Sequence, residues 1–289
     1  MKPLVFQTDF GADHLSASAM IGVCRGVCPE LPIYEATHMI RQFDVLNASD
    51  ALMYNLPFWK ETVFVSVVDP GVGTRRRSCV AKLRDGNFIV TPDNGTLTYV
   101  KQRWGIEAVR EIDEAINRYK STRDIYIFHG RDVYAYCAAR LASGVISFEE
   151  VGPSYPVEDI VETPYPVPEI GSDGFLTGMV IEASEHFGLV NSNIPFSWLA
   201  QKGIHYGTPV DVEILHGDRT VFSGTLAVER SFGYVPPHDA LVMQSETGTV
   251  SLGENLGNFV THYNLDFGCE WIIRLKKSEG IPVKTGGAQ

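Results

Sequence analysis

Residues 62–74 read Thr62-Val63-Phe64-Val65-Ser66-Val67-Val68-Asp69-Pro70-Gly71-Val72-Gly73-Thr74. The first seven are almost all β-branched or aromatic, which predicts a buried strand. The loop that follows contains a proline, which fixes φ, and two glycines, which permit positive φ or close approach of a ligand to the backbone. Asp69 is therefore expected at the carboxyl end of a strand, which is where α/β proteins bind ligands.

The segments around this strand alternate between strand and helix patterns. Strands are expected over residues 4–7, 33–36, 62–68, 78–83, 88–90 and 126–128, and helices over 17–27, 47–56 and 133–142. The Asp-Gly pair within 84–87 predicts a hairpin. The alternation predicts an α/β sandwich with a largely parallel sheet, in which polar loops beginning at Asp9, Asp69 and His129 each follow a strand.

A proline-rich segment divides the chain. Residues 163–168 read Thr-Pro-Tyr-Pro-Val-Pro, which predicts an extended linker over 161–173 between an N-terminal α/β catalytic domain, 1–160, and a C-terminal domain, 174–289. Short strands expected over 174–183, 209–215, 219–229, 240–243, 249–252 and 271–275, with glycine-rich turns and little helix, predict a small β-barrel or sandwich. The last residues, 286–289, are expected to fray.

Composition restricts the function classes. The chain has 289 residues, with 24 Lys and Arg against 35 Asp and Glu, and its net charge of -11 disfavours a nucleic-acid partner. No stretch approaches the ~18–20 apolar residues of a membrane helix, and no signal peptide is recognisable. The five scattered cysteines suit free thiols in a reducing compartment, so we expect a cytoplasmic protein without a metal site.

Three residues form the strongest candidate constellation. Asp69, Arg76 and His129 could converge on one water molecule, with the arginine holding the carboxylate and the histidine orienting or deprotonating the water. The competing interpretation is an aspartate that caps a turn, a solvated arginine and a core histidine. Asp9 either accepts hydrogen bonds from both hydroxyls of a ribose or caps the segment after it.

Other polar and aromatic residues carry weaker signals. The sequence Asp93-Asn94-Gly95 is more typical of a turn than of a site, and Arg75 and Arg77 are expected to be surface charges. Three aromatic residues of the second domain, Phe187, Phe232 and Tyr234, either sandwich a planar base or belong to the core.

Taken together, several motifs resemble a known family. They are Thr8-Asp9-Phe10-Gly11, Ala36-Thr37-His38, Val68-Asp69-Pro70-Gly71-Val72-Gly73-Thr74-Arg75-Arg76, Pro92-Asp93-Asn94-Gly95 and Phe128-His129-Gly130-Arg131-Asp132. In this order and spacing they resemble the S-adenosyl-L-methionine hydroxide adenosyltransferase family, whose relatives include the fluorinase and chlorinase enzymes. The match covers the first domain almost fully and thins in the second.

The resemblance implies hydrolysis of S-adenosyl-L-methionine to adenosine and L-methionine, by attack of water or hydroxide on C5' of the ribose. It also implies a homotrimer with sites between subunits, and no cofactor. By position, the family's catalytic triad falls on Asp69, Arg76 and His129, which argues for water over a halide. The expected substrate-binding residues are Asp9, Ser16, Phe128, Phe187, Phe232 and Ser245.

Two departures from the family pattern concern the substrate. Leu189 stands where relatives have an asparagine expected to read the adenine edge, and Glu246 stands where the halogenases have an arginine near the methionine carboxylate. Two alternatives therefore stay open: the same chemistry on another 5'-substituted adenosine, or non-catalytic binding of adenosine or S-adenosyl-L-methionine.

Overall fold

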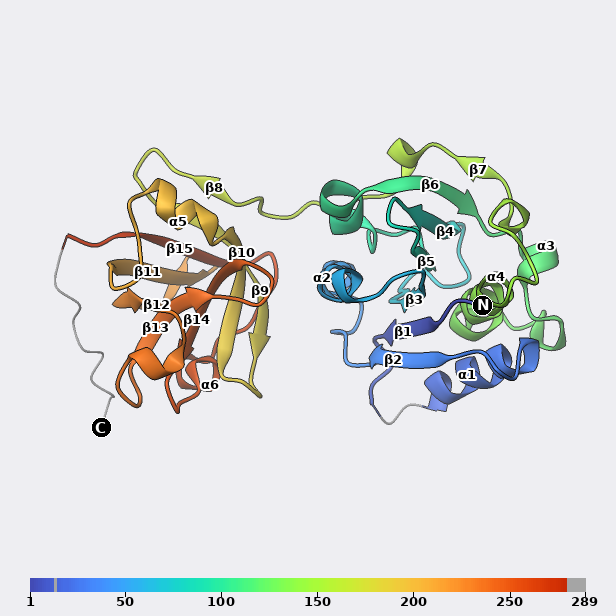
Figure 1. Cartoon of the computed structure of the whole chain (residues 1–289), viewed down its shortest axis with the longest axis horizontal. Coiled ribbons are helices and arrows are strands. Elements are labelled where there is room, and N and C mark those ends of the chain that lie inside the picture. Colours follow the sequence, from blue (N-terminus) through green and yellow to red (C-terminus); the bar gives the residue numbers. More distant parts are fainter. Residues whose placement is uncertain (13–14, 280–289) are drawn as a thin grey trace. The chain divides into compact units, whose positions relative to one another are not determined.

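The computed structural model describes residues 1–12 and 15–279, so the end that was expected to fray, 286–289, lies outside it. The chain divides into two compact units, residues 1–163 and 164–289 (Figure 1). Each unit has a sheet of its own. Within the described residues, none of the helices is both long and apolar enough to cross a bilayer.

The first unit is built on a seven-stranded sheet of order β2-β1-β3-β5-β4-β6-β7. The strands are β1 Leu4–Thr8, β2 Ile33–Thr37, β3 Val63–Val67, β4 Ser78–Leu83, β5 Phe88–Pro92, β6 Ile106–Glu111 and β7 Ser154–Tyr155. Strands β2, β1, β3 and β5 are parallel neighbours, and β4, β6 and β7 extend the sheet in antiparallel fashion. The predicted α/β fold is confirmed, as is the β4–β5 hairpin around Asp85-Gly86.

Helices cover both faces of this sheet. They are α1 Leu15–Val27, α2 Val45–Asn55, α3 Glu114–Asn117 and α4 Tyr136–Ser143, with a π-helical segment, Gly130–Ala135, before α4. In β3, Val63 and Val65 belong to the core cluster that includes α1 and α4 residues, whereas Phe64 belongs to the cluster that includes residues of α2. Because alternate residues of β3 are buried in opposite layers, the strand is apolar except for Ser66, whose buried hydroxyl accepts a hydrogen bond of 2.9 Å from the Gln7 side chain.

The strand expected over 126–128 is wrong. These residues are irregular, Ile127 is 82% exposed, and His129 lies at the start of the following helical segment. The Phe128 carbonyl accepts a hydrogen bond of 3.1 Å from the Asp132 N–H, so the end of this segment bonds to the helical segment after it and not to a neighbouring strand. A run of three apolar residues does not distinguish such a segment from a strand.

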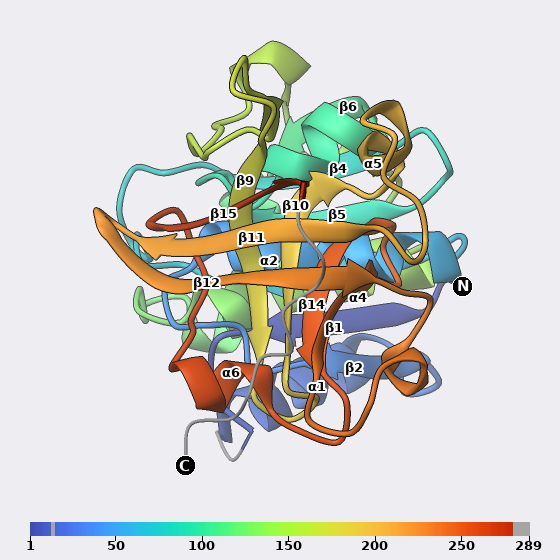
Figure 2. The same cartoon turned by 90° about the vertical axis from the view of Figure 1, so that its left-hand side faces the viewer.

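The second unit contains a closed seven-stranded β-barrel, which confirms the predicted barrel (Figure 2). Its strands are β9 Leu176–Ser184, β10 Leu189–Pro195, β11 Pro209–His216, β12 Arg219–Val228, β13 Ala240–Gln244, β14 Thr249–Glu254 and β15 Trp271–Lys277. A short strand, β8 Glu169–Ile170, pairs with β9 outside the barrel. The helices of this unit are α5 Ser197–Gln201 and α6 Phe259–Tyr263. Pairing of β10 with β9 closes the ring.

Among the strands of the barrel, the closing strand β10 is the one that the sequence pattern did not predict; in the first unit, β6 was not predicted either. Its centre carries three consecutive polar residues, Asn191, Ser192 and Asn193, and all three are buried. Ser192 donates to the Val250 carbonyl at 2.9 Å and Asn193 donates to the Pro166 carbonyl at 2.8 Å. Because these hydrogen bonds offset desolvation, β10 is buried without the apolar pattern of a buried strand.

Closure of the barrel depends on Gly178 in β9. A methyl group there would lie 2.3 Å from the Asn193 side-chain oxygen and 2.6 Å from Ile194. We expect Gly178→Ala to lower the free energy of unfolding by about 1–3 kcal/mol, because β9 and β10 would be forced apart. Gly233→Ala, at a site with no atom within 4 Å, is the control and is expected to be nearly neutral. Chemical denaturation measures both, and equal stabilities would contradict the prediction.

Candidate active site

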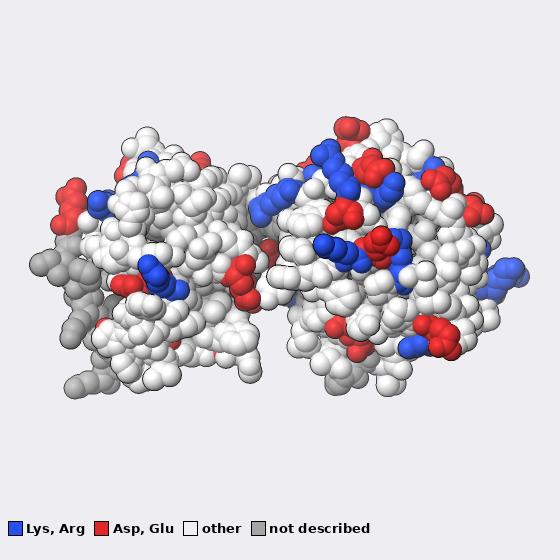
Figure 3. All heavy atoms as spheres, in the orientation of Figure 1, with Lys and Arg blue, Asp and Glu red and all other residues white. Residues whose placement is uncertain are grey.

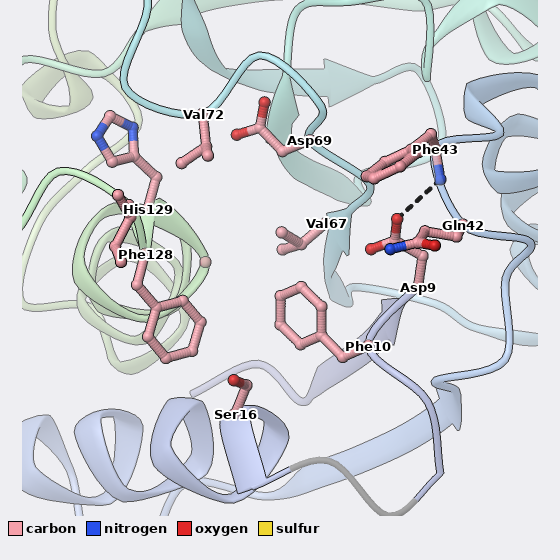
Figure 4. Close-up of a pocket in the computed structure, with 12 residues that line it drawn as sticks. Asp9, Phe10, Ser16, Gln42, Phe43, Val67, Asp69, Val72, Phe128 and His129 are labelled. Carbon is pink, nitrogen blue, oxygen red and sulfur yellow. Dashed lines mark hydrogen bonds between the residues drawn. The ribbon is translucent and has the colours of Figure 1, made fainter.

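A cavity of about 440 Å³ opens in the first unit beside the carboxyl ends of β1 and β3 (Figure 4). This volume falls in the range of roughly 300–1,000 Å³ that is typical of small-molecule sites. Five segments line it, namely the turn after β1, the turn after β3, the start of α1, residues 42–43 and residues 127–130. The structure places five of the expected site residues in its wall: Asp9, Ser16, Asp69, Phe128 and His129.

Asp69 and Arg76 form a nearly buried ion pair at the end of β3, with side chains 6% and 11% exposed. Arg76 donates from Nε at 2.8 Å to one carboxylate oxygen of Asp69 and from Nη2 to the other, so the pair is bidentate. Tyr134 adds a hydrogen bond from its hydroxyl to Asp69 at 3.1 Å, and Arg76 Nη1 donates to Ser78 at 2.8 Å. The carboxylate is therefore fixed in orientation at the cavity wall.

The same guanidinium joins His129 to this pair. Arg76 Nη2 lies 3.0 Å from Nδ1 of His129, and because a guanidinium can only donate, Nδ1 is the acceptor. Burial lowers the pKa of His129; Arg76 and Arg118 lower it further, against the opposing effect of Glu114 and Asp69. At neutral pH the imidazole is therefore uncharged. Arg76 is not among the residues that line the cavity, so it links two wall residues from behind.

Two contacts fix the loop that carries Asp69. Gly73 has φ of 74°, and a methyl group there would lie 2.9 Å from the Tyr126 carbonyl oxygen. Asn94 donates from its side-chain amide to the Val68 carbonyl at 2.9 Å. The loop is thus packed against the segment that leads to His129, and glycine is required where they touch.

Asp9 provides a second carboxylate in the cavity wall. Its Oδ2 accepts a hydrogen bond of 3.0 Å from the backbone N–H of Phe43, drawn as a dashed line in Figure 4. Burial raises the pKa of Asp9, with a smaller contribution from the negative charge of Asp69, while the Phe43 N–H opposes this rise. Phe43 adopts a left-handed backbone conformation, φ 66°, which a phenylalanine rarely takes.

A chain of hydrogen bonds supports the turn that carries Asp9. The Phe10 N–H donates to the Thr8 hydroxyl at 3.2 Å, and this hydroxyl lies 2.9 Å from Nδ1 of His38. His38 Nε2 in turn lies 3.1 Å from the Glu35 carboxylate. His38, which belongs to the Ala36-Thr37-His38 motif, thus has a structural contact with this turn.

Two aromatic rings lie in the cavity wall. Phe10 and Phe128 pack edge to face with centroids 5.9 Å apart. A methyl group on Gly130 would lie 3.2–3.3 Å from Phe128, Phe10 and Val67, so glycine lets these side chains approach the helical segment closely. The cavity therefore combines an apolar surface with the two carboxylates.

The remaining expected site residues belong to the second unit. Phe187 is 69% exposed in the turn between β9 and β10, and the Phe232 ring lies against Gly253. The Ser245 hydroxyl is hydrogen-bonded to Thr249 at 2.9 Å. Their roles as substrate-binding residues stay predictions.

Arg77, expected to be a surface charge, has a side chain that is 32% exposed and paired. Its Nε donates at 3.1 Å to the buried carboxylate of Asp93, and its guanidinium lies 4.2 Å from the centre of the Tyr155 ring. Asp93 also accepts a hydrogen bond from the Val161 N–H at 2.8 Å. The pair thus fixes the segment that leads to the end of the first unit, whereas Arg75 is exposed.

Four residues around the triad had no sequence signal of their own. Tyr134 and Ser78 bond to Asp69 and Arg76, and Glu114 and Arg118 approach His129. Only their spacing from recognisable motifs could have suggested them: Ser78 is two residues after Arg76, and Tyr134 is five after His129. Glu114 and Arg118 lie far from any motif in the sequence.

The fold and the cavity agree with the family that the motifs suggested. Residues 4–152 match the SAM hydroxide adenosyltransferase N-terminal domain, and the chain belongs to this family. An (R)-S-adenosyl-L-methionine hydrolase from Salinispora tropica is 33% identical over 253 residues, covering 87% of this chain and 90% of the relative. A fluorinase from Nocardia brasiliensis is 27% identical, covering 92% and 95%.

A solved structure also resembles the whole chain. The crystal structure of an uncharacterized conserved protein from Thermotoga maritima aligns with a TM-score of 0.86 at 30% identity, covering 95% of this chain and 100% of that chain.

The left-handed conformation of Phe43 has a measurable cost. Phe43→Gly keeps the N–H that bonds Asp9 and relieves about 1–2 kcal/mol of backbone strain, which offsets the entropic cost of glycine. We expect its free energy of unfolding to stay within about 0.5 kcal/mol of the wild type. Phe58→Gly is the control, since Phe58 is 75% exposed and does not have positive φ; it is expected to lose about 1 kcal/mol. Equal losses in urea denaturation would contradict the strain argument.

Proposed function

We propose that the protein hydrolyses S-adenosyl-L-methionine to adenosine and L-methionine. The observation that carries this proposal is the network of Asp69, Arg76 and His129, two of which line a cavity that also contains Asp9. The names of the hydrolase relatives support the same reaction. On the face in Figure 3, basic side chains of the first unit are interspersed with acidic ones, which suits a small-molecule substrate better than a nucleic acid.

The sulfonium of the substrate is already a good leaving group, so the main task of the protein is to align the attacking water with C5' of the ribose. The water oxygen forms a bond to C5' of the ribose while the C5'–S bond breaks, and its electron pair stays on sulfur, which changes from a sulfonium cation to a neutral thioether. One proton leaves the water, and neutral His129 accepts it at Nδ1, the ring nitrogen that carries no proton. This transfer replaces the contact of Nδ1 with Arg76 Nη2, which keeps its hydrogen bond to Asp69. Asp69, held by Arg76, orients the water in line with the C5'–S bond.

The wall residues have complementary roles in this proposal. Asp9 accepts hydrogen bonds from the ribose hydroxyls, Ser16 contributes a further polar contact, and Phe128 packs against the nucleoside. Two carboxylates in one cavity also complement the positive sulfonium of the substrate.

We further propose that Phe187, Phe232 and Ser245 bind substrate from the second unit of a neighbouring subunit in a homotrimer. Phe187 is an exposed aromatic side chain, which suits a surface that becomes covered on binding. A cytoplasmic location completes the proposal, because all five cysteines lie within the described residues and are free thiols.

Hydrolysis in water enriched in oxygen-18 tests this reaction. Attack at C5' places the label in the 5'-hydroxyl of adenosine and none in methionine, and mass spectrometry of both products measures it. His129→Ala should lower kcat by about 10²-fold or more through loss of the proton acceptor. His205→Ala, the same change at an exposed histidine, should match the wild type.

Three results would contradict the proposal. They are an absence of adenosine, unlabelled adenosine, or a His129→Ala variant as fast as the wild type. If the protein acts only on other 5'-substituted adenosines, the same reaction takes place on a different substrate, which is the alternative that Leu189 and Glu246 left open. Binding without turnover would favour the non-catalytic alternative.

A further inference from the structure

A second ion pair, Glu114 with Arg118, lies beside His129. Helix α3 begins after Asp113, whose side chain caps it by accepting the Ala115 N–H. Glu114 and Arg118 are four residues apart at its two ends and form an ion pair. Arg118 is only 9% exposed, whereas the Glu114 side chain is 36% exposed, so the cation is the more deeply buried member.

Both nitrogens of the His129 ring face a guanidinium. Arg76 Nη2 lies 3.0 Å from Nδ1, and Arg118 Nη1 lies 3.5 Å from Nε2. Because guanidinium groups donate and cannot accept, an imidazolium would direct an N–H at a donor on each side. The geometry disfavours the charged ring, and the shorter contact selects the tautomer in which Nδ1 accepts.

Two carboxylates favour the charged ring. Glu114 Oε1 lies 3.9 Å from Nδ1 of His129. The carboxylate of Asp69, which is bound to Arg76, also raises the pKa of the ring through its negative charge. Tyr134, the titratable group from the helical segment after His129, stays neutral because burial raises its pKa well above the usual value. The charged groups that face the ring are therefore two cations, Arg76 and Arg118, and two anions.

Arg118 also holds the segment that precedes His129. Its Nη2 donates to the Ile125 carbonyl, and its guanidinium lies 5.2 Å from the centre of the Tyr126 ring. The same side chain therefore contacts the ring and orders the backbone that carries the ring into the cavity wall.

We infer that Glu114 and Arg118 are positioning residues that together set the orientation and protonation state of His129. The inference rests on the proposed function, in which neutral His129 accepts the proton from water. The two residues act on the ring in opposite directions, since Arg118 disfavours its charged form and Glu114 favours it.

Opposite changes in pH dependence follow from this arrangement. Activity that requires neutral His129 persists above the pKa of the ring and falls as the pH drops through it. Glu114→Gln removes a neighbouring anion, so the pKa of His129 falls and the acid limb of the kcat profile moves to lower pH. Arg118→Gln removes a neighbouring cation, so both move to higher pH, each by about half a pH unit or more.

The test combines two readouts on the full-length protein. NMR of protein labelled at histidine Cε1 follows the titration of His129 without any turnover, and the pH profile of kcat follows its effect on hydrolysis. Glu107→Gln is the matched control, because Glu107 forms an exposed ion pair with Lys82 at 2.7 Å between β4 and β6. We expect no change in either readout for the control.

Shifts of opposite sign in the two variants support the inference, and absent or same-sign shifts overturn it. If Arg118→Gln does not fold, the downward shift in Glu114→Gln decides the question, and Arg118→Lys should restore a pKa near the wild-type value. The NMR titration also separates the two proposals. Absence of hydrolysis with opposite NMR shifts contradicts only the proposed function, whereas hydrolysis without the shifts contradicts only the positioning role.

Discussion

The nearly buried pair of Asp69 and Arg76 is the constraint on which the cavity depends. A charge removed from water is stable only when it is paired and its remaining polar atoms have partners. Here Tyr134, Ser78 and His129 supply those partners, so three segments must meet at one point. These contacts hold three segments in one arrangement: the loop after β3, the helical segment after residue 129 and the start of β4. The Asp69 carboxylate is fixed as a result.

Much of the fold was predictable because local signals agreed with tertiary structure. Strand β3 combines β-branched residues with burial on both faces, and an Asp-Gly pair produced the expected hairpin. The failures share a physical cause. Strand β10 is buried although its centre is polar, and Ser192 and Asn193 find hydrogen-bond acceptors in residues distant in sequence, Val250 and Pro166. In the segment 126–128, Tyr126 and Ile127 are apolar or aromatic yet exposed. Neither property is visible in a short window of sequence.

The site was predictable where a residue lies within a motif. Asp69 and His129 each belong to a recognisable segment, and resemblance to the family, rather than spacing alone, selected Arg76 over its neighbours. The ion pair of Arg77 was not predicted, because its partner, Asp93, is sixteen residues away and buried. The groups that set the electrostatics of the ring lie on the short helix α3, which no pattern marked, so only the folded structure reveals the balance of charges around His129.

A crystal structure of the protein with adenosine, the product of the proposed reaction, tests the central claim most directly. We expect the ribose hydroxyls to lie on the Asp9 carboxylate and the 5'-oxygen to lie within hydrogen-bonding distance of Asp69 or His129, at the position from which water attacks. Adenosine bound with its 5'-oxygen directed away from both residues, or bound outside this cavity, would contradict it.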